Sequence, residues 1–257
     1  MISSFAIVPS APLLLPEYAG RADCGAQLRA LAVAAVEHAA VGADQIVLVH
    51  ATDRDPRHTR SALGLRVGAH LVAGAGRRIT SVAVQWDAPV SVCREHGSAI
   101  GAGESRVGLV VVADGCARRG EKAPGYLDER SFGYDREWLV ALGGVEPELS
   151  SPAEMVPAAV RGGVNSAGLL ALDAEVGADL LCHGRAPLQV LGGALARATA
   201  SHGGTAGRGG TARRGGTAVY AIPPGQLWVG DPFGVRYVVA AGGRIAIPTA
   251  ASAGISA

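Results

Sequence analysis

The sequence predicts a single domain of the α/β class with a mostly parallel central sheet. Strand and helix patterns alternate along the chain, beginning with an apolar run, a helical repeat and a second apolar run before residue 51. Strand–helix–strand units of this kind build parallel sheets with right-handed crossovers. The length of 257 residues lies at the upper end of what one hydrophobic core serves.

The first unit has the clearest pattern. Residues 5–9 predict a short buried strand that ends in a proline-rich turn. Residues 21–41 repeat Ala, Leu and Val at helical spacing, and residues 42–44 end the predicted helix. Residues 45–50 form an apolar, β-branched run, which predicts a strand buried on both faces.

Later segments repeat the alternation. Residues 79–85 alternate as a strand does, and residues 106–113 form the strongest predicted strand. Ser150, Ser151 and Pro152 predict a helix start, because serine caps helices and proline suits the first turn. The other predicted elements are a helix ending near 143–144, helices over 166–174 and 188–198, and strands over 218–222 and 235–240 around a turn at 230–234.

Residues 1–245 form the predicted domain. Within it, residues 202–218 are of low complexity, and the unit Gly-Gly-Thr-Ala starts at positions 203, 209 and 215 with arginines between. This segment has too few apolar residues to pack, so it predicts a surface loop. Residues 246–257 predict a disordered tail.

Composition and charge argue against several classes of protein. The net charge of +1 argues against a nucleic-acid partner. No apolar stretch reaches the roughly 18 residues of a membrane span, and the N-terminus lacks the positive region of a signal peptide. The four cysteines show no C-x-x-C spacing, which favours buried thiols in a reducing compartment. We therefore expect a cytoplasmic protein without a membrane partner, and homo-oligomer formation stays open.

Polar side chains follow the predicted strands at four places along the chain. In parallel α/β sheets, ligands bind at the carboxyl ends of the strands. The candidate site residues at these ends are Ser10, His50, Asp53, Asp114, Arg118, Arg119, His183 and Arg185.

Two of the candidates are histidines, His50 and His183. A lone histidine after an apolar run is more often a hydrogen-bonded core residue than a metal ligand. If both meet one carboxylate at a sheet edge, they predict the facial site that binds Fe(II) and leaves positions open for dioxygen and substrate. Asp53, Asp114 and Glu17 are candidate third ligands, and spacing does not choose among them.

A charged run follows the turn at residues 114–115. Arg118, Arg119 and Lys122 accompany Glu121 there. Such a run is either a solvated surface or a set of guanidinium groups that bind a carboxylate or phosphate at the mouth of a pocket. The sequence contains no G-x-S-x-G, no phosphate-binding glycine loop and no H-E-x-x-H.

Three segments resemble a known superfamily. Residues 110–130, VVVADGCARRGEKAPGYLDER, resemble the signature of an actinobacterial group in the B-like subunit superfamily of class III extradiol dioxygenases. Residues 184–191, GRAPLQVL, are similar to the glycine-arginine-x-proline segment of its Memo-like branch. Residues 7–12 lie where the superfamily has its first strand and ligand loop. The resemblance covers most of residues 1–240, apart from the glycine-rich segment.

The resemblance implies a three-layer α/β/α domain and, in active members, one Fe(II) that binds a catecholate and dioxygen. Ser10 stands where the active pattern has its first histidine, and His50 matches the second. The late ligand falls near His183. Arg118 falls near the histidine that acts as acid and base, and a guanidinium cannot exchange protons near neutral pH.

The sequence leaves two main hypotheses. In the first, the protein is an extradiol dioxygenase in which His50 and His183 hold Fe(II), and Arg118 or Arg119 binds a carboxylate of a catecholic substrate. In the second, a catalytically degenerate, metal-free member binds a small anion or a protein partner through Asp114, Arg118 and Arg119. A third, RNA contact through residues 202–218, is disfavoured because a nearly neutral chain has little affinity for phosphates.

Overall fold

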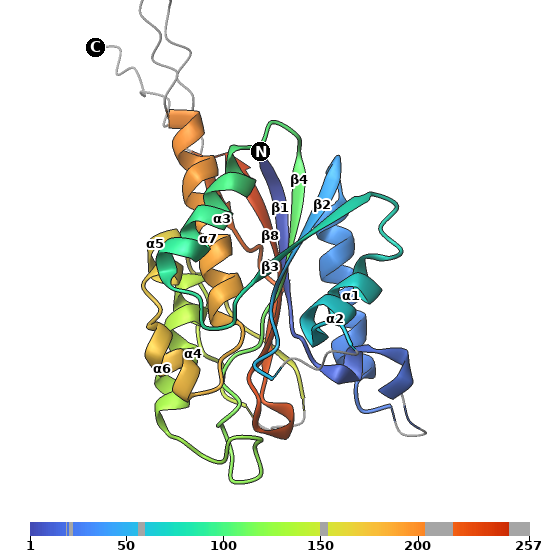
Figure 1. Ribbon diagram of the computed structural model, residues 1–257, viewed down its shortest axis with the longest axis vertical. Coiled ribbons are helices and arrows are strands. Elements are labelled where there is room, and N and C mark those ends of the chain that lie inside the picture. Colours follow the sequence, from blue (N-terminus) through green and yellow to red (C-terminus); the bar gives the residue numbers. More distant parts are fainter. Residues whose placement is uncertain (19, 21–22, 56–59, 150–153, 204–217, 247–257) are drawn as a thin grey trace, which may run out of the picture.

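A single mixed sheet forms the centre of the molecule (Figure 1). The computed structural model describes the chain except residues 19, 21–22, 56–59, 150–153, 204–217 and 247–257. The strands within the described residues are β1 (Ile2–Val8), β2 (Gln45–Ala51), β3 (Arg78–Val84), β4 (Val107–Val112), β5 (Val156–Pro157), β6 (Ala218–Ala221), β7 (Leu227–Gly230) and β8 (Tyr237–Ala246).

The strand order is β3–β2–β4–β1–β8–β7–β5, with β6 also paired to β8. Strands β3, β2, β4 and β1 pair in parallel, whereas β8 is antiparallel to β1, β6 and β7. The α/β class predicted from the sequence is therefore confirmed, and the sheet is parallel in its core and antiparallel beyond β1. Parallel strands end at the same edge of the sheet, so the loops after β1, β2 and β4 lie close together.

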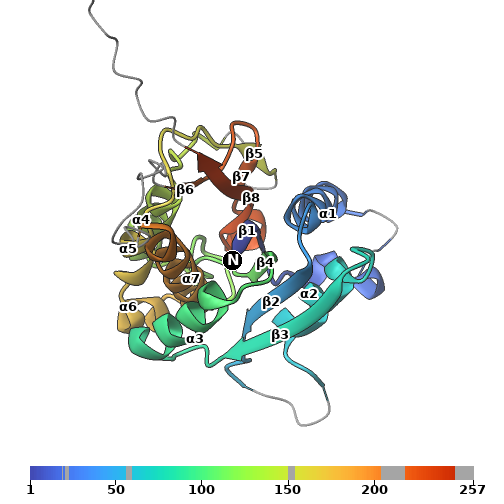
Figure 2. The same ribbon diagram turned by 90° about the horizontal axis from the view of Figure 1, so that it is seen from above.

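Helices cover both faces of the sheet (Figure 2). They are α1 (Ala26–Ala40), α2 (Leu63–Val72), α3 (Val90–Ala102), α4 (Arg130–Ala141), α5 (Ser166–Leu170), α6 (Ala174–Asp179) and α7 (Arg185–Gly203), together with short 3-10 turns at Pro12–Leu14, Pro16–Tyr18 and Pro232–Gly234. Helices α1 and α2 lie on one face, and α3 to α7 lie on the other.

The alternation of strand side chains divides the core between these two faces. In β1, Ala6 and Val8 pack in a cluster with the buried residues of α1 and α2. Their neighbours Phe5 and Ile7 pack in a second cluster with the buried residues of α3, α4, α5 and α7. Successive side chains of a strand point to opposite faces, so an unbroken apolar strand serves both clusters.

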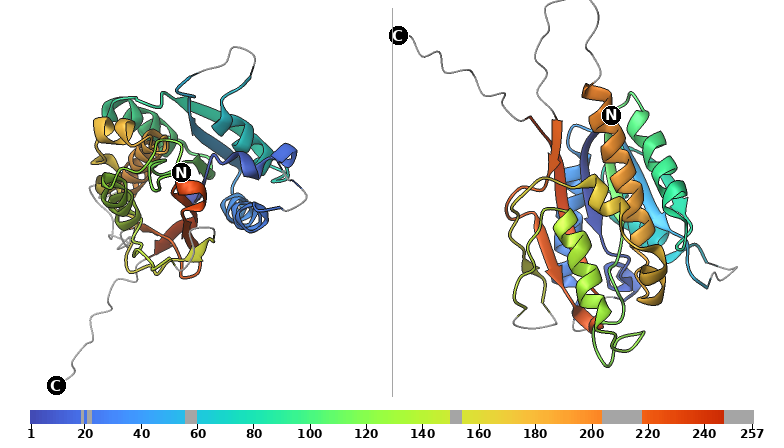
Figure 3. Two further views of the ribbon diagram at one scale, coloured as in Figure 1. Left: turned by 90° about the horizontal axis from the view of Figure 1, so that it is seen from below. Right: turned by 90° about the vertical axis from the view of Figure 1, so that its left-hand side faces the viewer.

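Helices α3 and α7 run side by side at very close range (Figure 3, right). Gly97 permits this approach, because a Cβ atom at that position would lie 2.6 Å from the backbone nitrogen of Ala194. Gly101 meets α7 in a similar way. This contact fixes the middle of α7 against α3.

The structure agrees with some of the elements predicted from the sequence and differs from others. The predicted strands at 45–50, 79–85 and 106–113 appear as β2, β3 and β4, whereas no sequence pattern predicted α2 or α3. The helix start predicted at Ser150–Pro152 lies outside the described residues, and β5 follows instead of a helix. Residues 204–217 of the predicted loop and 247–257 of the predicted tail also lie outside them. Among the described helices, none combines the length and hydropathy needed to cross a membrane.

Candidate functional site

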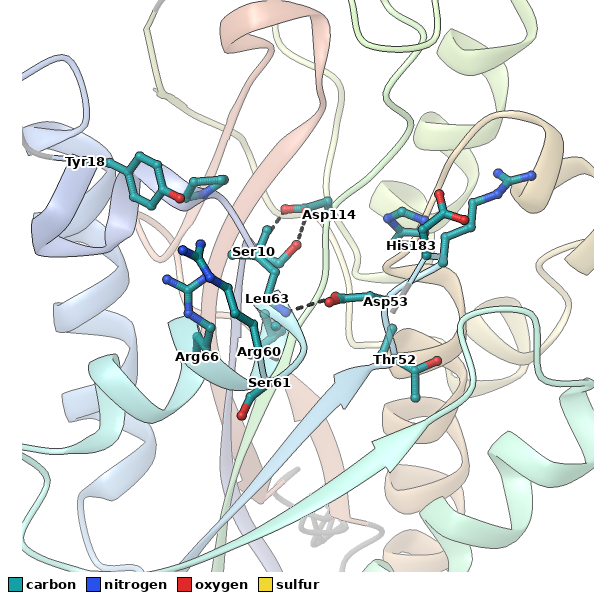
Figure 4. A pocket seen from close by; sticks show the side chains of 16 residues that line it. Ser10, Tyr18, Thr52, Asp53, Arg60, Ser61, Leu63, Arg66, Asp114 and His183 are labelled. Carbon is teal, nitrogen blue, oxygen red and sulfur yellow. Dashed lines mark hydrogen bonds between the residues drawn. The ribbon is translucent and has the colours of Figure 1, made fainter. Parts of the chain in front are cut away.

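A cavity of about 400 Å³ opens at the carboxyl ends of β1, β2 and β4 (Figure 4). The loops after these strands, the start of α2 and the segment before α7 supply its side chains. Its lining consists of Ser10, Pro12, Tyr18, Ala51, Thr52, Asp53, Arg54, Asp55, Arg60, Ser61, Leu63, Gly64, Arg66, Val112, Asp114 and His183. The structure thus brings Ser10, Asp53, Asp114 and His183, four of the candidates chosen at strand ends, to one cavity.

Ser10 and Asp114 form a hydrogen-bonded pair inside the cavity. The backbone N–H of Ser10 donates to Asp114 Oδ1 at 2.8 Å, and the Ser10 hydroxyl donates to Asp114 Oδ2. Burial raises the pKa of Asp114 to about 6, although the two bonds from Ser10 act in the opposite direction. Near neutral pH, Asp114 therefore exists in both protonation states and can accept or donate a hydrogen bond.

His183 presents a ring nitrogen that has no partner within the described structure. Its Nε2 atom is buried and makes no hydrogen bond. Burial and the positive charge of Arg54 lower the pKa of His183, so the ring is neutral at pH 7. Trp86 orients the ring through an edge-on contact with centroids 6.0 Å apart, and the Arg54 guanidinium lies 4.6 Å from the Trp86 ring centroid.

His50 lies near the cavity but does not line it. Its side chain is 3% exposed, and Nδ1 lies 3.0 Å from the carbonyl oxygen of Ala51. A carbonyl can only accept, so Nδ1–H is the donor in this contact. Gly64 of α2 packs against the His50 side chain, since a Cβ atom at position 64 would lie 3.2 Å from His50 Cβ.

In the described part of the chain, no group of potential metal ligands joins His50 and His183 to a carboxylate. There, the one group of three or more His, Cys, Asp or Glu side chains close enough to share a metal is Cys116, Asp135 and Cys182. An iron site needs at least one carboxylate beside His50 and His183. The described residues therefore do not fit the Fe(II) face that the resemblance implies.

The candidate carboxylates have other partners. Asp53 accepts a hydrogen bond from the backbone N–H of Leu63 at 2.9 Å and so fixes the start of α2. Glu17 pairs with Arg66 at 2.5 Å. These bonds shape the cavity rather than a metal centre.

Arg118, Arg119 and Arg185 are absent from the cavity lining. Arg119 is buried and pairs with Asp135 at 3.0 Å and Asp231 at 2.8 Å. Arg185, only 1% exposed, donates to the carbonyl oxygens of Ala88 and Trp86 and to the side chain of Gln189. Arg119 and Arg185 thus stabilise the fold, and neither lines the cavity at the ends of β1, β2 and β4.

Other arginines line the cavity instead. Arg60 and Arg66 lie together on one side, below Tyr18, while Asp53, Asp114 and His183 lie on the other side (Figure 4). Neither of these two arginines was predicted from the sequence. The available signal was weak: Arg60 lies between β2 and α2, on the connection that begins near Asp53, and Arg66 lies within α2.

No family model matches the sequence, and no curated protein matches it significantly.

Proposed function

We propose that this chain is a member of the B-like subunit superfamily of class III extradiol dioxygenases, with a three-layer α/β/α fold, whose cavity binds a hydroxylated aromatic carboxylate without Fe(II). The proposal depends on one observation, the position of two arginines across the cavity from a protonatable carboxyl group and a histidine with an unpartnered ring nitrogen. Arg60 and Arg66 lie on one side, and Asp114 and His183 lie opposite.

The arginine side suits a carboxylate. Guanidinium groups bind carboxylates through paired, charge-assisted hydrogen bonds. Arg66 is already paired with Glu17, whereas Arg60 has no ion pair among the described residues. Arg60 is therefore the residue that we assign to the ligand's carboxylate.

The opposite side suits a hydroxyl group. The neutral ring of His183 has an unpartnered Nε2, and Asp114 can accept or donate near neutral pH. A phenolic hydroxyl offers one donor and two acceptor positions, so it would satisfy either residue. The volume of about 400 Å³ lies within the usual range for sites that bind small molecules.

The incomplete iron ligand set supports the metal-free form of the proposal. The described residues bring no carboxylate to both His50 and His183, and two ligands hold a first-row metal weakly. The residues of this cavity would therefore bind and orient the ligand.

Titration calorimetry with three probes in chelator-treated buffer tests the proposal. We expect 3,4-dihydroxybenzoate to bind more tightly than catechol, which lacks the carboxylate, or benzoate, which lacks the hydroxyls. Arg60→Gln should weaken 3,4-dihydroxybenzoate binding by about 10- to 100-fold, because a hydrogen bond to a charged group contributes roughly 1.5–3 kcal/mol. Catechol binding should not change.

Arg136→Gln is the matched control, since it removes one exposed arginine from α4, outside the cavity lining. Equal affinities for catechol and 3,4-dihydroxybenzoate would contradict the assignment of Arg60. Stoichiometric Fe(II) binding that His50→Ala and His183→Ala both abolish would establish the ring-cleaving hypothesis instead.

A further inference from the structure

Two buried cysteines face each other across a pair of loops behind the cavity. Cys116 follows β4, and Cys182 precedes α7. Two backbone hydrogen bonds hold the two loops antiparallel. The Gly184 N–H donates to the Asp114 carbonyl at 2.9 Å, and the Ala117 N–H donates to the Leu180 carbonyl at 3.1 Å. In this register, Cys116 lies opposite Cys182.

Asp135 of α4 completes a group of three potential ligands. One ligand atom from each of Cys116, Asp135 and Cys182 lies within 4.8 Å of the other two. All three residues are buried, with exposed fractions of 0%, 1% and 3% respectively. Ligands of a tetrahedral Zn²⁺ are about 3.3–3.8 Å apart, given bonds of about 2.0–2.3 Å. Small side-chain adjustments would therefore bring these atoms to bonding distance.

The Asp135 carboxylate is held in a fixed orientation. Its Oδ1 accepts from the Cys116 backbone N–H at 2.9 Å and from Trp138 Nε1 at 3.1 Å, and its Oδ2 accepts from Arg119 Nη1 at 3.0 Å. A carboxylate has about four acceptor positions, so these three bonds leave one on Oδ2. Carboxylates that bind metals are commonly oriented by hydrogen bonds of this kind.

Charge and ligand type favour a thiophilic divalent cation. A metal displaces the proton of each cysteine that binds it, so exchange of two protons for one divalent cation leaves the charge of the buried group unchanged. Arg119 balances the remaining charge of Asp135. Thiolates select Zn²⁺ over Mg²⁺ and Ca²⁺, which prefer oxygen ligands alone.

We propose that Cys116, Asp135 and Cys182 bind one Zn²⁺ ion, with water as the fourth ligand. The site is distinct from the cavity, because none of the three residues lines it. Each cysteine lies within two residues of a cavity residue, Asp114 in one loop and His183 in the other. The ion would therefore have a structural role and fix the two loops that support the cavity.

The metal content of the purified full-length protein tests the site. After expression with added zinc and a chelator wash, we expect about one zinc per chain, because structural sites bind this ion tightly. Cys116→Ser and Cys182→Ser should each lower the zinc content at least about tenfold. Cys93→Ser is the matched control, since Cys93 is also buried but lies outside the group, and it should retain the metal.

If the serine variants do not fold, X-ray absorption at the zinc edge of the wild-type protein still tests the proposal. We expect two sulfur neighbours at about 2.3 Å. A first shell without sulfur, wild-type protein that contains no zinc, or full zinc in the Cys116→Ser/Cys182→Ser double variant would each overturn the proposal. These readouts do not depend on binding of aromatic acids, so the two proposals can fail independently.

Discussion

Ser10 and Asp114 are 104 positions apart in the sequence, yet the Ser10 backbone N–H donates to Asp114 Oδ1 at 2.8 Å. The bond joins the loops that follow β1 and β4, two neighbouring parallel strands. It also holds the half-buried Asp114 carboxyl group where loss of solvent raises its pKa to about 6. One side chain thus links the geometry of the cavity to the stability of the fold.

Replacement of Asp114 by Asn should change how stability depends on pH. A carboxyl group whose pKa is raised by folding binds its proton more tightly in the folded state, so its contribution to stability is complete below the unfolded value and is lost as pH rises through the folded value. The pKa rises from 3.8 to about 6, which corresponds to about 2–3 kcal/mol lost between pH 4 and pH 7. Asn does not titrate and escapes this loss.

Urea unfolding of wild type and Asp114→Asn at pH 4 and pH 8 measures the effect. The stability of the variant relative to wild type should be about 2–3 kcal/mol higher at pH 8 than at pH 4. Asp44→Asn, at an exposed carboxylate paired with Arg106, controls for a general change of charge. A relative stability that does not change with pH would show that Asp114 is not desolvated.

The sequence could predict the sheet core because its strands are buried on both faces. Apolar, β-branched runs such as residues 45–50 need no tertiary information to be recognised. The sequence also placed Ser10, Asp53 and Asp114 at strand ends, and parallel strand ends meet at one edge. His183 was expected at a strand end too, but it lies between α6 and α7 and reaches the cavity from there. Which side chains then point into the cavity depends on pairing partners, and this was not predictable. Arg119, for example, is drawn into the interior by Asp135 and Asp231.

Helix α3 was missed because small residues form much of its buried face. Its buried residues are Cys93, Gly97 and Gly101, which give little hydrophobic periodicity. Their burial follows from the close approach of α7, a contact between segments about 90 residues apart that local pattern analysis does not detect. The same reason explains why glycine, normally unfavourable inside helices, occurs twice on this face.

Gly97→Ala should therefore destabilise the protein. The added methyl group would collide with the backbone of α7, which cannot move aside as a side-chain end can. We expect a loss of about 1–3 kcal/mol in the free energy of unfolding. Gly133→Ala is the control in α4, where an added Cβ meets no atom within 4 Å, and it should stabilise by about 0.5–1 kcal/mol through helix propensity.

Denaturant unfolding of the two alanine variants measures the expected loss of stability in Gly97→Ala and the expected gain in Gly133→Ala. Equal effects of the two substitutions would mean that α3 and α7 are farther apart than the structure shows. Because both changes add the same methyl group to a helical glycine, intrinsic propensity cancels in their difference. The difference then reports the helix contact alone.

A buried network of charges connects the loop after β4 to α4 and to the turn before β8. Arg119 pairs with Asp135 and Asp231, and Asp231 also lies 3.1 Å from Arg236. Arg236 in turn pairs with Glu146. Removal of one member of such a network leaves a buried charge without its counter-ion, which costs far more than the intact pair contributes.

Arg119→Met should consequently lower the free energy of unfolding by about 3–5 kcal/mol, because Asp135 and Asp231 both lose a buried partner. Arg106→Met removes the same functional group from the exposed pair with Asp44 and should have little effect, because exposed ion pairs contribute little to stability. The two variants share the change in side chain and net charge, so their difference isolates burial. Equal losses in denaturant unfolding would mean that Arg119 is solvated, as a surface charge would be. A large difference would show that the arginine first considered as a ligand contact is required for the fold itself.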